Sequence, residues 1–118
     1  MKKDSVHDLI NNAYTAFNRR DLDAAVALMD PEVHWPNGWE GGFVEGHHGV
    51  RDYWTRQWRE LDAKVIPVSI QQREDGRVEV EVQQTVKDVL GNLLSDGRVT
   101  HLYTLENGSI KSMEIIHT

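Results

Sequence analysis

The hydrophobic pattern of this chain changes its period near Lys64, and this change limits the folds that the chain can adopt. In the first half, apolar residues recur every three or four positions, which places them on one side of a helix. In the second half, apolar and polar residues alternate, which is typical of half-buried strands. Asp75-Gly76 and Asn107-Gly108 mark tight turns between these strands. Helices followed by an antiparallel meander predict an α+β domain with helices on one face of a sheet.

The helical pattern also predicts where the first elements lie. Helices are expected over residues 5–20, 21–29 and 48–61. Asp21 can cap the second helix, which is expected to stop after Met29 because Pro31 cannot continue it. A short strand is expected over 32–35, and the glycine-rich run 38–46 predicts a loop with little regular structure.

The alternating pattern predicts the remaining elements. Strands are expected over 64–72, 77–89, 93–94, 98–106 and 110–117. Ile66, Val68 and Ile70 alternate with polar residues, so they are expected on the buried face of the first of these strands. Valines share one face of the strand that follows. Asp96-Gly97 is expected to be a turn between two strands.

Charge and cysteine content exclude several classes of function. The formal net charge is −6, from 19 acidic and 13 basic residues, which argues against nucleic acid or an anionic membrane as partner. Cysteine is absent, which excludes disulfides, thiolate nucleophiles and Cys-type zinc sites. The 118 residues contain no apolar run of signal-peptide or transmembrane length. The sequence therefore predicts one cytoplasmic domain spanning residues 1–118.

Three segments carry a family likeness. They read AYTAFNRRDLDAAVALMDPEVHW, VEGHHGVRDYWTRQW and RVTHLYTLENGSIKSMEIIHT, in this order. Together they resemble the NTF2-like superfamily, in particular its SnoaL-like and ketosteroid-isomerase-like branch. The resemblance implies a cone in which three N-terminal helices pack on a strongly curved, mostly antiparallel sheet that encloses a pocket. It also implies a homodimer formed through the outer faces of the sheets.

The resemblance leaves the chemistry open, because the carboxylates that the family uses are missing. The ketosteroid-isomerase positions for a tyrosine, a base and an acid fall on Ala13, Asn37 and Thr100. Asn37 cannot take a proton from carbon at neutral pH, so isomerisation by that mechanism is not expected. The carboxylate of the SnoaL-like cyclases falls on Ile115, whereas His101 resembles their histidine.

Histidines are therefore the candidate acid/base groups, since an unperturbed imidazole titrates near pH 6.5. His101 and His117 are the two predicted catalytic residues. His101 and Thr100 must face opposite sides of the sheet, and the sequence leaves open which of them lines the pocket. Adjacent histidines such as His47-His48 rarely share one ion, so no metal and no cofactor are expected.

The aromatic residues predict either a packed core or the wall of a ligand pocket. Trp54 and Trp58 lie four residues apart on one helix face, so their rings are neighbours. If these rings line a pocket, a flat apolar ligand fits it, and a few polar side chains fix its orientation. The predicted ligand-binding residues are Tyr14, Phe17, Trp35, Asn37, Trp54, Trp58, Gln84, Thr100, Met113 and Ile115.

Two functions remain open at this point. The first is a small-molecule-binding protein with an aromatic-walled pocket and proton-transfer chemistry of the isomerase, cyclase or dehydratase type on an apolar cyclic substrate. The second is a non-catalytic ligand-binding or dimerisation module of the same fold. The aromatic residues favour a ligand in either case, and the missing carboxylates favour the second function.

Overall fold

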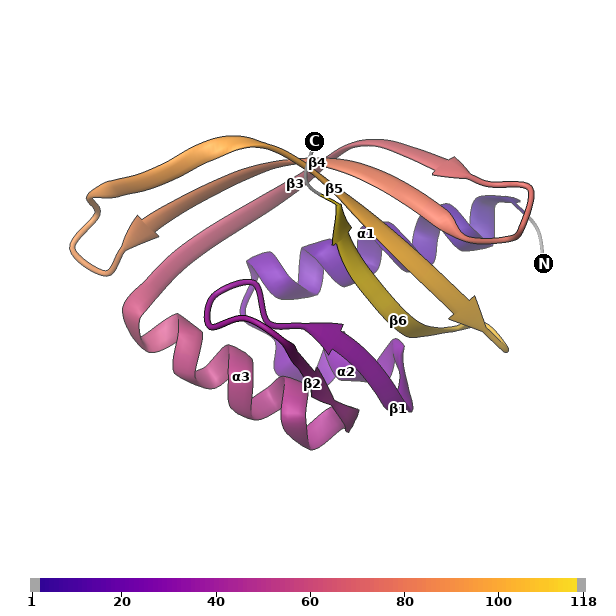
Figure 1. Cartoon of the computed structure of the whole chain (residues 1–118), viewed down its shortest axis with the longest axis horizontal. Helices are drawn as coiled ribbons and strands as arrows, with labels where there is room; N and C mark the ends of the chain where they lie inside the picture. Colours follow the sequence, from indigo (N-terminus) through magenta and orange to yellow (C-terminus); the bar gives the residue numbers. More distant parts are fainter. Residues whose placement is uncertain (1–2, 117–118) are drawn as a thin grey trace.

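The computed structural model describes residues 3–116, and the side chains of residues 6–116, as three helices and six strands (Figure 1). The helices are α1 (Lys3–Asn18), α2 (Leu22–Ala27) and α3 (Gly46–Glu60). The strands are β1 (Met29–Pro36), β2 (Phe43–Glu45), β3 (Leu61–Gln72), β4 (Val78–Asp88), β5 (Leu93–Glu106) and β6 (Ser109–Ile116). No helix among them is long and apolar enough to cross a membrane.

All six strands form one sheet in the order β2-β1-β6-β5-β4-β3. Neighbouring strands are antiparallel except β1 and β6, which are parallel. Figure 1 shows α1 and α3 on one side of the long strands, where α1 packs on β3 and α3 packs on β1. The predicted α+β fold with a mostly antiparallel sheet is confirmed, while the strong curvature of the sheet stays a prediction.

The core lies between the sheet and the helices, and the valine face of β4 is its centre. Val78, Val80 and Val82 are fully buried, as the alternating sequence predicts. The register pairs Val78 with Tyr103 and Val80 with His101, so these two β5 side chains lie on the same face as the valines. The buried face of β4 thus determines which residues of β5 point inward.

Asn18 at the end of α1 attaches this helix to the edge strand β3. Its amide nitrogen donates to the Val65 carbonyl at 2.8 Å, and its oxygen accepts from the Val65 amide at 2.9 Å. Arg20, which has a positive φ of 62°, extends the attachment by donating to the Ala63 carbonyl and to Asp62. These bonds fix the inner face of α1 relative to the sheet.

The second helix is shorter than predicted. Asp21 caps it as expected, because its carboxylate accepts from the amide of Ala24. The helix ends at Ala27, however, and Met29 begins β1. The Leu28 carbonyl accepts from the amide of Ile110, so β6 draws this segment into the sheet before Pro31 is reached. The prediction that Met29 belongs to the helix is wrong.

The predicted turn at Asp96-Gly97 is also wrong, because both residues lie inside the continuous strand β5. Asp96 pairs with Thr85 and Gly97 pairs with Gln84. The Asp96 carboxylate accepts from the side chains of Gln83 and Thr85 on the neighbouring strand, which holds it in the sheet. The turn instead follows β4, where Asp88 accepts from backbone amides.

Ile66 and Val68 do not face the core as predicted. They are 55% and 48% exposed, whereas Ala63 and Val65 are buried. The pairing of β3 with β4 shifts between Pro67 and Ser69, so the residues that point inward change from odd to even numbers there. Ile70 lies beyond the shift and packs against the core as expected. The outer face of β3 therefore carries two apolar side chains.

Candidate functional site

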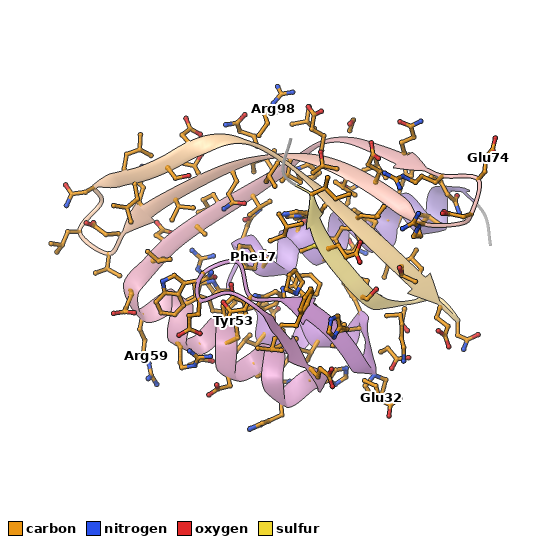
Figure 2. The ribbon with its side chains drawn as sticks, viewed as in Figure 1. Phe17, Glu32, Tyr53, Arg59, Glu74 and Arg98 are labelled. Carbon is orange, nitrogen blue, oxygen red and sulfur yellow. The ribbon has the colours of Figure 1, made fainter. Side chains whose placement is uncertain are left out.

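A cavity of about 450 Å³ lies between the inner face of the sheet and the helices α1 and α3. Figure 2 shows Phe17 and Tyr53 in the space between the long strands and α3, while the side chain of Arg98 points away from it. Arg98 instead donates to Glu81 on the outer face of the sheet. The inner position of the cavity follows from the parity of the strands, which turns their apolar residues toward the helices.

One wall of the cavity is aromatic. The rings of Trp35 and Trp54 meet edge to face, with centroids 5.5 Å apart and planes at 90°. Phe17 meets Trp54 in a similar way at 5.1 Å and 72°. Trp39 reaches the cavity from the loop between β1 and β2. Edge-to-face rings are rigid and well packed, so this wall suits a flat apolar molecule.

The polar part of the opposite wall consists of three buried side chains that are joined by hydrogen bonds. The Tyr103 hydroxyl lies 2.7 Å from the Tyr14 hydroxyl, which in turn lies 2.7 Å from Nδ1 of His101. Tyr14 comes from α1, whereas His101 and Tyr103 both point inward from β5. All three are at least 94% buried. The packing of α1 on the sheet is therefore what brings these side chains together.

Burial keeps these three side chains uncharged. Burial lowers the pKa of His101 from its usual 6.5 to about 4, so its imidazole is neutral at pH 7. Burial also raises the pKa of Tyr14 well above its usual value, and the Coulombic effect of Tyr103 adds to that increase. The pKa of Tyr103 is raised mainly by burial as well. These three side chains therefore offer hydrogen bonds and no formal charge.

Two glutamines supply further polar groups. Gln84 interrupts the valine face of β4 and lines the cavity. It pairs with Gly97, four residues along β5 from His101, so the two side chains lie about 13 Å apart along the strands. Gln57 on α3 also lines the cavity and donates to the Tyr53 hydroxyl at 3.0 Å. A molecule that contacts both His101 and Gln84 must therefore be elongated.

A family model for the SnoaL-like domain matches residues 10–113, which is most of the chain. The chain belongs to the SnoaL-like family. No curated protein matches it.

Three solved structures illustrate the likeness of this SnoaL-like chain to known folds. An NTF2-like protein of unknown function from Burkholderia pseudomallei is 22% identical with a TM-score of 0.84, over 100% of this chain and 92% of that chain. TerC, crystallised with polyporic acid, is 25% identical with a TM-score of 0.83, over 97% of this chain and 92% of that chain. A Mycobacterium tuberculosis protein in complex with estradiol-17β-hemisuccinate is 14% identical with a TM-score of 0.82, over 97% and 94%. These likenesses show that the fold is NTF2-like.

Most of the residues predicted to bind a ligand in this SnoaL-like domain lie at the cavity. Those that line it are Tyr14, Phe17, Trp35, Trp54, Gln84, Met113 and Ile115, and the predicted catalytic residue His101 lines it as well. His117 lies outside the described residues. Thr100 is on the outer face, where it pairs with Glu81, so the open question of whether Thr100 or His101 faces inward is answered by the register. Trp58 stacks on Trp54 at 5.6 Å behind the wall.

Asn37 is buried, but its side chain is engaged by the loop between β1 and β2. Its oxygen accepts from the amides of Trp39 and Glu40, at 3.2 and 2.7 Å. Its nitrogen donates to the Glu40 carboxylate at 2.9 Å, and that carboxylate accepts two bonds from Arg56 on α3. Hydrogen bonds from Arg56 and Asn37 lower the pKa of Glu40. This arrangement ties the loop that carries Trp39 to α3.

Several cavity residues are absent from the sequence prediction, and the aromatic ones are Tyr53, Trp39 and Tyr103. Tyr103 could have been found, because it is two residues from His101 on an alternating strand and must share its face. Tyr53 lies on the apolar stripe of α3, where the sequence alone does not separate core from cavity. Within residues 3–116, no three His, Asp or Glu side chains gather in a way that could hold a metal ion.

Proposed function

We propose that residues 1–118 form one SnoaL-like domain that binds a small, apolar, cyclic molecule in the cavity. The observation that carries this proposal is the combination of an aromatic wall, made by Trp35, Trp54 and Phe17, with a buried polar chain that ends at His101. Apolar walls supply most of the affinity of such a site, and a few polar groups supply its orientation. TerC and the Mycobacterium tuberculosis protein, crystallised with polyporic acid and an estradiol derivative, support a ligand of this kind.

Proton-transfer chemistry of the isomerase, cyclase or dehydratase type is the catalytic form of this proposal. The chain from Tyr103 through Tyr14 to His101 supports it, because a buried imidazole can donate a hydrogen bond to an oxygen on which charge develops. In this form His101 is the catalytic residue, with Gln84 holding the far end of the substrate. His117 stays a second candidate from the sequence.

A non-catalytic binding module is the second candidate, and one observation favours it. Among the described residues that line the cavity, Asp96 is the only carboxylate. Its oxygen is already engaged by Gln83 and Thr85 on the outer face of the sheet. A free carboxylate base is therefore missing from the described part of the inner wall, which favours binding without turnover.

The proposed function is tested by filling the cavity. Ala63 lines the cavity from β3 and is 5% exposed, so Ala63→Phe should occupy ligand space. Lys64→Phe introduces the same ring at the next residue, which is exposed, and is the matched control. Binding of fluorene, a flat tricyclic hydrocarbon, is measured by quenching of the fluorescence of Trp35, Trp39 and Trp54. We expect Ala63→Phe to weaken binding about tenfold or more and Lys64→Phe to leave it unchanged.

Two results would contradict the proposal. One is equal affinity of both variants and the wild type for fluorene, which would place the bound molecule elsewhere. The other is the absence of any ligand, both from the protein purified from its own cells, by native mass spectrometry, and in titrations with flat polycyclic compounds. Circular dichroism of Ala63→Phe checks that the variant is folded before its affinity is interpreted.

A homodimer through the outer faces of the sheets is part of the proposal. The exposed apolar side chains of Ile66, Val68, Leu93 and Leu94 on β3 and β5 support it. Burial of such exposed apolar side chains favours association.

A further inference from the structure

Hydrogen bonds can run along the three buried side chains Tyr103, Tyr14 and His101 in two directions, and these two directions present opposite groups to a ligand. In the first, Tyr103 donates to Tyr14, Tyr14 donates to Nδ1 of His101, and the ring proton of His101 is on Nε2. In the second, Nδ1–H donates to Tyr14, Tyr14 donates to Tyr103, and Nε2 carries a lone pair. The first arrangement offers a donor to the cavity and the second offers an acceptor.

The burial of Tyr103 decides between the two arrangements. Its side chain is 1% exposed, and Tyr14 is the one hydrogen-bond partner of its hydroxyl among residues 3–116. In the second arrangement the Tyr103 hydrogen would have no acceptor, and a buried donor without a partner is costly. In the first arrangement every hydroxyl hydrogen is used, and the donor left without a protein partner is Nε2–H, which is not sealed from solvent. If Tyr14 accepted from both neighbours, its own hydrogen would be buried without a partner instead. The first arrangement is therefore the more stable one.

Nε2 of His101 is the end of this chain that a ligand can reach. It has no hydrogen-bond partner in the described part of the chain, and it is not among the polar atoms that are sealed from solvent. His101 itself lines the cavity. Burial also disfavours the doubly protonated imidazolium, which leaves a single ring proton to be placed. A ligand therefore meets Nε2 directly.

We propose that Tyr103 and Tyr14 hold the neutral His101 as an Nε2–H donor, so that the cavity selects a ligand with an acceptor oxygen, such as a ketone or quinone, over a hydroxyl or amine donor. This inference rests on the proposed ligand-binding function and names the chemical class that the site takes. Tyr14 and Tyr103 are positioning residues in it, and the Nε2–H group contacts the ligand.

The first test reads the tautomer directly, without a ligand. ¹⁵N NMR of histidine-labelled protein at pH 7 distinguishes protonated from unprotonated ring nitrogens, and the His101→Gln spectrum identifies the His101 signals. We expect the Nε2–H form in the wild type and a mixture of both tautomers in Tyr103→Phe. Thr85→Val is the control, because it removes a hydroxyl that bonds Asp96 on the outer face of the sheet and does not line the cavity. A wild-type spectrum with the proton on Nδ1 would overturn the proposal.

The second test compares 9-fluorenone, 9-fluorenol and fluorene, which share a flat tricyclic skeleton. Fluorenone can only accept, and the hydrogen of fluorenol would be buried without an acceptor. We expect fluorenone to bind about tenfold more tightly than fluorenol in the wild type and in Thr85→Val. The preference should shrink in Tyr103→Phe. Tighter binding of fluorenol in the wild type would overturn the proposal.

The two tests separate this inference from the proposed function. If all three fluorene compounds fail to bind while His101 carries its proton on Nε2, the ligand-binding function fails and the tautomer assignment stands. If fluorene binds but fluorenone and fluorenol do not differ, the binding function stands and the selection of an acceptor oxygen fails. The wild-type spectrum and the wild-type affinities decide both points even if Tyr103→Phe does not fold.

Discussion

Replacing Asn37 with alanine tests whether this side chain holds a loop or a ligand. The sequence predicts a ligand contact, whereas the structure engages Asn37 in the loop between β1 and β2. Its oxygen accepts from two backbone amides, those of Trp39 and Glu40. Its backbone also bonds Gly42 and Gly41, so the loop closes around this residue. We expect Asn37→Ala to destabilise the protein.

The size of the effect follows from the burial and the partners of Asn37. The side chain is 7% exposed, so water does not replace its bonds freely. Two hydrogen bonds to backbone amides, at about 1 kcal/mol each, give a loss of about 2 kcal/mol in the free energy of unfolding. The bond to the Glu40 carboxylate is left out of this sum because that group is exposed. For a chain of this size the melting temperature should fall by roughly 6–10 °C.

Urea unfolding monitored by circular dichroism measures this loss. Asn11→Ala is the control, because Asn11 is exposed on α1 and should change stability by less than about 0.5 kcal/mol. Asn37→Asp keeps the accepting oxygen and should retain part of the loop. The loop assignment is refuted if Asn37→Ala unfolds like the wild type but binds fluorene or fluorenone ten times more weakly. That result would make Asn37 a ligand-binding residue, as the sequence predicts.

Two further predictions concern pH and assembly. Because burial lowers the pKa of His101 to about 4, the folded state binds fewer protons than the unfolded state between pH 6.5 and 4, so stability is full above pH 6.5 and falls as pH is lowered through this range. The free energy of unfolding should fall by about 3 kcal/mol across this range, as measured by urea unfolding at pH 6.5 and at pH 4. In His101→Gln the decrease should be smaller by that amount. An equal pH dependence of stability in the two proteins would refute this prediction. Sedimentation at high micromolar concentration should find a dimer that Val68→Lys, on the outer face of β3, converts to monomer. A monomeric wild type at this concentration would refute the proposed dimer.

Local patterns were sufficient to predict the elements whose faces are set by burial within the same segment. The valine face of β4 follows from alternation along the strand. The stripe of α3 with Val50, Tyr53 and Trp54 follows from helical spacing. Both sets of residues are buried in the structure. The wall residues Trp35 and Trp54 follow from the same rules. Whether they form a core or a cavity depends on how far the opposing elements are held apart, and no single segment contains that information.

The features that could not be predicted depend on partners far along the chain. Asp96-Gly97 has the composition of a turn, but Gln83 and Thr85 on β4 keep Asp96 in the sheet. The register shift after Pro67 reverses the face of β3, and it is defined only by the strand beside it. The inward position of His101 likewise follows from its pairing with the buried Val80. The sequence predicts that Thr100 and His101 face opposite sides of the sheet, but which of them faces inward depends on the pairing of β5 with β4.

The hydrogen-bonded residues of the candidate site also depend on contacts between segments that are far apart in the sequence. Tyr14 is on α1, and its partners His101 and Tyr103 are on β5, near the other end of the chain. The orientation of α1 is set by Asn18, one helical turn further along, through its two bonds to Val65 on the edge strand. Because residues four apart on a helix share a face, a fixed Asn18 also fixes Tyr14. The proton position on His101 is therefore a consequence of how α1 docks on the sheet, and a family member without the Tyr14 and Tyr103 pair would lose the preference for an acceptor oxygen while keeping the fold.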